Sequence, residues 1–179
     1  MRQFFIHTIT LLAVVLATTT ISAQENSSFN EVKQITDDIR LKYVPDKRVA
    51  IFNIGYTVQQ NSVTLTGRTT QEDAHAALID ALRDKGYAVT DNVTLLPNRK
   101  VHGETIYGII NISTCALRSS ADYSSEMVTQ ALLGMPVKII ERDGWYHIQT
   151  PDNYLAWTHR VGIHPVTREE LSAWNAAEK

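Results

Sequence analysis

The sequence predicts an α+β fold in two sections: a small helix–strand–strand–helix–strand unit, then a small all-β barrel. Two observations indicate the first section. Apolar residues fall at helical spacing over 30–43 and 74–82, and two stretches between them alternate apolar and polar residues. A third observation indicates the second section, because from residue 107 onward short apolar stretches are separated by turn residues.

Length and composition exclude several classes of protein. The chain has 179 residues, of which 44% are apolar and 20% charged, with a formal net charge of −2. This length suits one or two domains, and the composition is too apolar for a disordered chain. A nucleic-acid partner is not expected, since a slightly acidic chain lacks the basic excess that neutralises phosphates. The single cysteine excludes an internal disulfide.

The first 23 residues have the pattern of a secretory signal peptide. Arg2 precedes a mostly apolar run from Phe4 to Ala17, and small residues lead to Ala23. Cleavage there would make Gln24 the first residue of an exported protein, located in the periplasm or cell envelope, with no membrane span left. An uncleaved anchor is the alternative, although the run is short of the roughly 20 apolar residues that a span needs.

The first section, residues 24–98, is predicted to form an αββαβ unit. A helix is expected over 30–43, and strands are expected over 49–58, 63–67 and 87–96. Thr70 is expected to be the N-cap of the second helix, which has Glu72 and Asp73 in its first turn and ends at Gly86. The polar segment 98–104, which contains Gly103, is expected to be the boundary between the two sections.

The second section, residues 105–163, is predicted to contain short strands, with one of them inside 107–117. Asp143-Gly144 predicts a two-residue hairpin turn in which both residues have positive φ. Alternation in the returning strand, residues 145–149, places Trp145 and His147 on one face and Tyr146 and Ile148 on the other.

Two further expectations concern the large aromatics and the end of the chain. In a barrel this small, Trp145 and Trp157 are expected to pack inside. Residues 164–179 are expected to form a C-terminal helix or a linker, because Thr167 and Glu170 have the spacing of a capping box.

The first section resembles the BON fold of exported bacterial proteins over residues 30–97. The resemblance is carried by the alternating Ser62–Gly67, an alanine-rich helix and Gly86 followed by a strand. It implies attachment to the envelope or to phospholipid without identifying a ligand. A simple spacer domain is the alternative.

The second section resembles a bacterial SH3-like domain over residues 107–163. Matching features are Arg118 in the opening strand, Gly134 before the Pro136 strand, and the runs 143–146 and 151–157; the usual Asn, Gly and Pro of the opening are missing. The run Ser125–Leu132 is similar to the modules that precede the papain-like catalytic domain of NlpC-type cell-wall peptidases. Those enzymes cut between D-glutamate and a diamino acid in peptidoglycan peptides.

The catalytic residues of such a peptidase are not expected in this chain. Catalysis would need a cysteine thiolate, a histidine base and a polar residue that orients it. In the resemblance, Cys115 takes the place of a buried leucine, so we expect a core residue rather than a nucleophile. His159 and His164 do not have metal-ligand spacing. No catalytic residue, metal or cofactor is therefore predicted.

Three residues are candidates for ligand binding. Tyrosines suit shallow, wet recognition sites, and Tyr123 and Tyr154 lie in predicted loops. The resemblance implies a tyrosine together with an acid that pairs with the free amine of a peptidoglycan stem peptide. By motif, Tyr154 and Glu126 are the nearest matches. A structural tyrosine and a solvated glutamate are the alternative.

The function predicted is an exported, non-catalytic module that binds a peptidoglycan stem peptide or an envelope protein. Two alternatives stay open. The chain is the non-catalytic front of an NlpC-type peptidase whose hydrolytic domain is absent from this chain, which the reading frame downstream of Lys179 would test. Otherwise it is a structural adaptor without a ligand.

Overall fold

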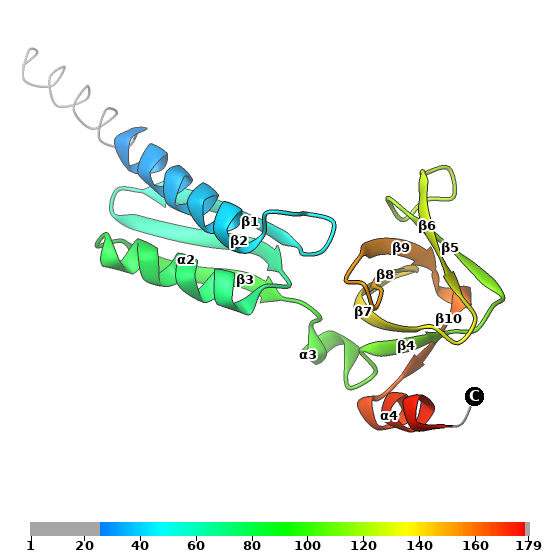
Figure 1. Ribbon diagram of the computed structural model, residues 1–179. Helices are drawn as coiled ribbons and strands as arrows, with labels where there is room; N and C mark the ends of the chain where they lie inside the picture. Colours follow the sequence, from blue (N-terminus) through cyan, green and yellow to red (C-terminus); the bar gives the residue numbers. More distant parts are fainter. Residues whose placement is uncertain (1–25, 178–179) are drawn as a thin grey trace, which may run out of the picture. The chain divides into compact units, whose positions relative to one another are not determined.

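A computed structural model describes residues 26–177 of the protein (Figure 1). The predicted signal peptide, residues 1–23, lies outside the described residues. The fold is α+β, as predicted, with a β-rich C-terminal part. The first half contains a helix over residues 26–43, β1 (Phe52–Gln59), β2 (Ser62–Thr69), α2 (Glu72–Asp84), β3 (Ala88–Leu95) and α3 (Arg99–His102).

The second half contains seven strands and two helices among the described residues. They are β4 (Tyr107–Ile110), β5 (Thr114–Arg118), β6 (Met127–Leu132), β7 (Pro136–Asp143), β8 (Trp145–Gln149), β9 (Leu155–His159), the 3₁₀ turn η1 (Arg160–Gly162), β10 (Ile163–Val166) and α4 (Arg168–Ala176).

The chain divides into two compact units. The first comprises the residues up to Tyr43, Gly55–Thr66 and Asp73–Asn92; the second comprises Val44–Ile54, Gly67–Glu72 and the residues from Val93 onward. The candidate site lies wholly within the second unit.

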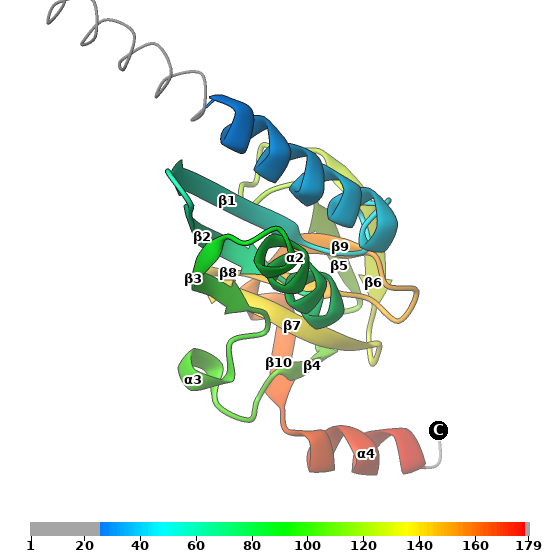
Figure 2. The ribbon, with the colours of Figure 1, turned by 90° about the vertical axis from the view of Figure 1, so that its left-hand side faces the viewer.

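The three-stranded sheet has the order β1-β2-β3. Ala88 N donates to Asn61 O near the start of both strands, and Leu96 N donates to Thr69 O near their ends, so β2 and β3 run parallel. Parallel neighbours need a crossover connection, and α2 supplies it. The helix of residues 26–43 and α2 lie on the same face of the sheet (Figures 1 and 2), where Val63 and Leu65 of β2 are fully buried.

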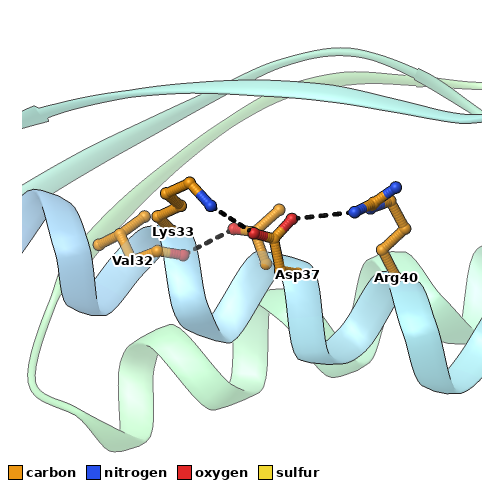
Figure 3. A network of polar contacts seen from close by, with 5 residues as sticks. Val32, Lys33, Asp37 and Arg40 are labelled. Carbon is orange, nitrogen blue, oxygen red and sulfur yellow. Dashed lines mark hydrogen bonds and ion pairs between the residues drawn. The ribbon is translucent and has the colours of Figure 1, made fainter.

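The N-terminal helix has one buried and one charged side. Val32 is fully buried and its carbonyl accepts a hydrogen bond from Thr36 Oγ1 at 2.8 Å. On the charged side, Asp37 pairs with Lys33 at 2.7 Å and with Arg40 at 3.2 Å (Figure 3). These ion pairs are at helical spacing and largely exposed, so they stabilise the helix only slightly.

The expectation that Thr70 caps α2 is wrong. The helix begins at Glu72, and Thr70 Oγ1 instead accepts a hydrogen bond from Ile51 N at 3.0 Å. Thr69 Oγ1 accepts from Gln71 N at 3.0 Å. The Thr70 hydroxyl therefore binds the residue before β1 instead of the start of α2. This is a long-range contact that local sequence does not reveal. The boundary segment 98–104 contains the short helix α3, capped by Asn98.

The seven-stranded sheet has the order β10-β4-β7-β8-β9-β5-β6 and curls into a small barrel (Figure 1). Its interior is one apolar cluster made by Ile110, Cys115, Leu117, Ala131, Val137, Ile139, Ile148, Ala156 and Ile163. The segment 107–117 contains two strands, β4 and β5, rather than the one expected. The two strands lie in different parts of the sheet, because β4 pairs with β7 whereas β5 pairs with β6 and β9.

The hairpin at Asp143-Gly144 is present, but its turn differs from the expectation. Asp143 pairs directly with Trp145, and Gly144 between them has φ +65°. Only Gly144 of the two has positive φ, so the turn is not the two-residue type in which both central residues do. The hairpin was predictable from this dipeptide, whereas its turn type was not.

The C-terminal helix begins with the predicted capping box. Thr167 Oγ1 accepts from Glu170 N, and the Glu170 carboxylate accepts from Thr167 N at 2.7 Å. The indole of Trp174 donates to Gly134 O at 3.1 Å, which ties α4 to the turn before β7. Among residues 26–177, no helix is long and apolar enough to cross a membrane.

Candidate functional site

The β8–β9 hairpin carries two cross-strand Trp–His pairs. The register places Trp145 opposite His159 and His147 opposite Trp157. The first pair meets edge-on, with ring centroids 5.5 Å apart and planes at 88°. The second pair is stacked, with centroids 4.4 Å apart and planes at 5°. Direct cross-strand pairs of aromatic rings stabilise a hairpin and fix the positions of its side chains.

The two tryptophans do not pack inside the barrel, contrary to the expectation. Both are half-buried and neither belongs to the interior cluster, whereas Ile148 is fully buried and Tyr146 packs against that cluster. The predicted alternation along β8 is therefore confirmed. Because side chains alternate along a strand, the same alternation that sends Ile148 inward sends Trp145 outward.

Tyr123 completes a pocket over the first Trp–His pair. Its ring is 4.8 Å from that of Trp145 and 5.6 Å from that of His159, and the side chain stays 66% exposed. The pocket has a volume of about 290 Å³. Its lining comes from the β4–β5 loop, β5, the β5–β6 loop, β8, β9 and η1: Ile112, Thr114, Cys115, Ala116, Arg118, Tyr123, Trp145, Thr158, His159, Val161 and Gly162.

Local hydrogen bonds fix the loop that carries Tyr123. Asp122 Oδ1 accepts from Ser124 N at 2.7 Å and from Ser124 Oγ at 2.8 Å, and these bonds lower the pKa of Asp122. Arg118 Nη1 donates to Ser125 O at 2.6 Å from inside the lining of the pocket. These hydrogen bonds order the loop that carries Tyr123 before a ligand binds. Less conformational entropy is therefore lost on binding.

Cys115 lies in the lining of the pocket as a buried residue, as predicted. Its Sγ and Thr158 Oγ1 are 3.0 Å apart in a hydrogen bond. Burial raises the pKa of the Cys115 thiol, so the thiolate that a nucleophile needs is disfavoured. A Cβ added at Gly162 would stand 2.8 Å from Sγ, so the glycine is what allows η1 to approach this close.

The second Trp–His pair does not line the Tyr123 pocket; its histidine binds the half-buried carboxylate of Glu141. His147 Nδ1 is 3.2 Å from Glu141 Oε2. This hydrogen bond is the main reason that the pKa of Glu141 is lowered, against the opposing effect of burial. An ionised carboxylate only accepts, so Nδ1 carries the proton. With its edge bonded and its face stacked on Trp157, His147 has a structural role.

The three candidate ligand residues are in different places. Tyr123 lines the pocket. Glu126 is exposed just before β6, where its carbonyl accepts from Ser119 N, and its side chain is not part of the lining. Tyr154 is half-buried, packs against the interior cluster and does not line the pocket. The structure thus does not bring the three together in one pocket.

Trp145, His159 and Arg118 line the pocket but were not predicted as site residues. A readable signal was present, because the run Trp-X-His occurs at 145–147 and again at 157–159. In an antiparallel hairpin such a repeat produces crossed Trp–His pairs. Within the described residues, no group of three or more His, Cys, Asp or Glu side chains is arranged to hold a metal ion.

Residues 117–160 match a family profile described as the bacterial dipeptidyl-peptidase Sh3 domain. This confirms the SH3-like resemblance of the second section. The match runs from the last two residues of β5 to the end of β9 and includes the pocket aromatics Tyr123, Trp145 and His159. The section is thus similar to a non-catalytic accessory module of the kind found in bacterial peptidases. No curated protein matches the chain. The BON resemblance of the first section stays a prediction.

Proposed function

We propose that the protein is an exported, non-catalytic module whose SH3-like section binds a short peptide of the bacterial cell wall. The observation that carries the proposal is the pocket lined by Tyr123, Trp145 and His159 in the SH3-like section. Aromatic rings with polar edges suit shallow, hydrated peptide sites. The family match supports a binding rather than a catalytic role for this section.

The state of the thiol supports the same division of roles. A hydrolytic cysteine needs a stable thiolate beside a histidine base. Cys115 instead shares a hydrogen bond with Thr158, and its pKa is raised by burial. We therefore expect that this section does not hydrolyse its ligand and releases the ligand chemically unchanged.

A peptide titration tests the proposal. The chain from Gln24 onward is titrated with the stem tripeptide L-alanyl-γ-D-glutamyl-diaminopimelate while NMR shifts are followed. Shifts should cluster at Tyr123, Trp145 and His159. A small, open site should bind weakly, with a dissociation constant of about 1 mM, which corresponds to a binding free energy of roughly −4 kcal/mol. Absence of shifts at several millimolar tripeptide would leave the structural adaptor as the better account.

Matched variants show whether the pocket is responsible. Tyr123→Ala removes an exposed wall and should abolish the shifts. Leu133→Ala is the control, since Leu133 has a similar exposed fraction, 63% against 66%, and does not line this pocket. Equal loss of binding in both variants would argue against the site.

The earlier candidates Glu126 and Tyr154 are resolved by the same titration. If the amine of the stem peptide pairs with Glu126 and the peptide flanks Tyr154, then Glu126→Gln and Tyr154→Phe should each weaken binding by several fold. The side chains of both residues lie outside the pocket lining, so little change is expected if the pocket is the site.

Export has a separate test. The signal-peptide pattern predicts cleavage between Ala23 and Gln24. Mass analysis of the N-terminus of protein recovered from the cell envelope should find Gln24 first. A retained Met1 would contradict export by this route.

A further inference from the structure

We infer that the pocket recognises the carboxylate of its peptide ligand rather than the amine, with Arg118 and His159 as the recognising groups. This inference rests on the proposed function and specifies the ligand class of the same pocket. It departs from the expectation that an acid pairs with a free amine, because the lining includes Arg118 and, among the described residues that form it, neither aspartate nor glutamate.

The hydrogen-bonding capacity of the lining favours an acceptor on the ligand. Arg118 and the indole of Trp145 can only donate. Thr158 Oγ1 is already bonded to Cys115. A free amine is a donor-only cation, and it would meet these donor groups without a carboxylate to pair with. A carboxylate carries two acceptor oxygens and suits the same groups.

His159 adds a further donor. Its Nδ1 accepts a hydrogen bond from Val161 N at 3.4 Å, at the start of η1. A backbone N–H can only donate, so Nδ1 is unprotonated and the neutral ring carries its proton on Nε2. The backbone of η1 therefore sets the tautomer, and the ring offers Nε2–H as a donor.

The Arg118 guanidinium keeps donors for a ligand. A guanidinium carries five N–H donors, and Nη1 donates one of them to Ser125 O at 2.6 Å. The planar fork matches a carboxylate in two-point contact better than an ammonium group does. Arg118 also acts electrostatically on Asp122, but that carboxylate lies outside the lining and accepts two bonds from Ser124.

The aromatic rings complete the specificity. Tyr123, Trp145 and His159 contact one another pairwise at 4.8, 5.6 and 5.5 Å, so they form three neighbouring apolar surfaces. A small apolar side chain next to the carboxylate can contact these rings. The ligand class is therefore a peptide segment with a free carboxylate beside a small apolar residue.

Four forms of one dipeptide test the inference: alanyl-alanine, its N-acetyl derivative, its C-terminal amide, and the compound with both changes. Each is titrated into the chain from Gln24 onward, with NMR shifts at Tyr123 and Trp145 as the readout. Amidation should weaken binding by about 10-fold or more, the range for a lost charge-assisted hydrogen bond. Acetylation should change the affinity by less than about 3-fold, because no described acid lines the pocket.

Variants locate the effect. Arg118→Gln should remove the difference between the acid and the amide, and Arg118→Lys should keep only part of it. Arg160→Gln is the matched control, since it removes the same charge from an exposed neighbour of His159 that does not line the pocket. Arg118 also holds the Tyr123 loop, so His159→Phe is a second variant: it keeps a ring, removes the Nε2–H donor, and should weaken binding of the acid more than of the amide.

The failures of the two proposals are distinguishable. Loss of binding on acetylation with no effect of amidation would overturn the carboxylate inference and leave the pocket as a peptide site that reads an amine. Equal binding of all four compounds would also overturn it. If none of the four binds, the inference is wrong, and the stem tripeptide titration then decides the proposed function on its own.

Discussion

The two faces of the β8–β9 hairpin are built from the same ten strand residues and differ completely in character. The inward face carries Ile148 and Ala156, both buried in the apolar cluster. The outward face carries the two Trp–His pairs, half-buried and in contact with polar partners. One face is held by close packing and the other by ring geometry and hydrogen bonds.

This difference separates stability from recognition. Removal of an inward side chain leaves a cavity that the rest of the barrel cannot fill. Removal of an outward side chain exposes surface that water can cover, so the fold tolerates it while the site does not. The following variants test this separation, in order of expected effect.

Ile148→Ala should cause the largest loss. Ile148 is fully buried and pairs across the sheet with Ile139. We expect a loss of about 2–5 kcal/mol in the free energy of unfolding, as for other large-to-small core substitutions. Urea unfolding followed by circular dichroism measures it. Val161→Ala, at a 65% exposed position, is the control and should cost less than about 0.5 kcal/mol. Equal losses in the two variants would break the comparison.

Cys115→Ala should cost less, about 1–3 kcal/mol, because the deleted group is small and Thr158 loses its partner. In the native protein the thiol should react slowly with a thiol reagent, since burial raises its pKa. Denaturation should make it react fully. Rapid labelling of the folded chain would contradict a core position.

Glu141→Gln tests the polar support of the outward face. The folded-state pKa of Glu141 lies below its ordinary value of 4.5, so the stabilisation is complete above that value and is lost as the pH falls through the lowered pKa. At neutral pH we expect the variant to be less stable by about 1–2 kcal/mol. The difference should vanish in acid. Urea unfolding at a series of pH values measures both, with Glu126→Gln as an exposed control. A difference that persisted in acid would mean that the ionised carboxylate, which His147 contacts at 3.2 Å and Arg68 at 2.7 Å, is not its source.

Tyr123→Ala should have the smallest effect on stability and a large effect on binding. The side chain is two-thirds exposed, so the free energy of unfolding should change by less than about 0.5 kcal/mol. The peptide shifts described above should nevertheless disappear. A loss of stability comparable to that of Cys115→Ala would show that the loop is part of the folded core. Residues for stability and residues for recognition would then not be separate.

Local patterns in the sequence predicted much of the fold. The order of elements in the first section, the hairpin at Gly144 and the capping box at Thr167 each depend on spacing within a few residues, and each is present. The errors arise where a distant contact decides. Thr70 Oγ1 accepts a hydrogen bond from Ile51 N, nineteen positions away, and this contact takes the place of the expected helix cap.

The candidate site was harder to predict, for two physical reasons. Hydrophobicity alone placed Trp145 inside the barrel, whereas the period of the strand only placed it on the face opposite Ile148. Since Ile148 is buried in the interior cluster, Trp145 lies on the other face. Tyr123 reaches the pocket because a loop without any periodicity is folded by Asp122, Ser124 and Arg118. The conformation of such a loop depends on its own hydrogen bonds and cannot be predicted from residue spacing.

The position of Trp145 in the pocket has a practical consequence: the protein contains its own optical probe. The chain has three tryptophans. Trp157 is covered by His147, and Trp174 is tied through its indole to Gly134 O. Neither of them lines the Tyr123 pocket. Ultraviolet emission should therefore respond to a ligand mainly through Trp145, so unlabelled protein at micromolar concentration can report occupancy of the pocket directly.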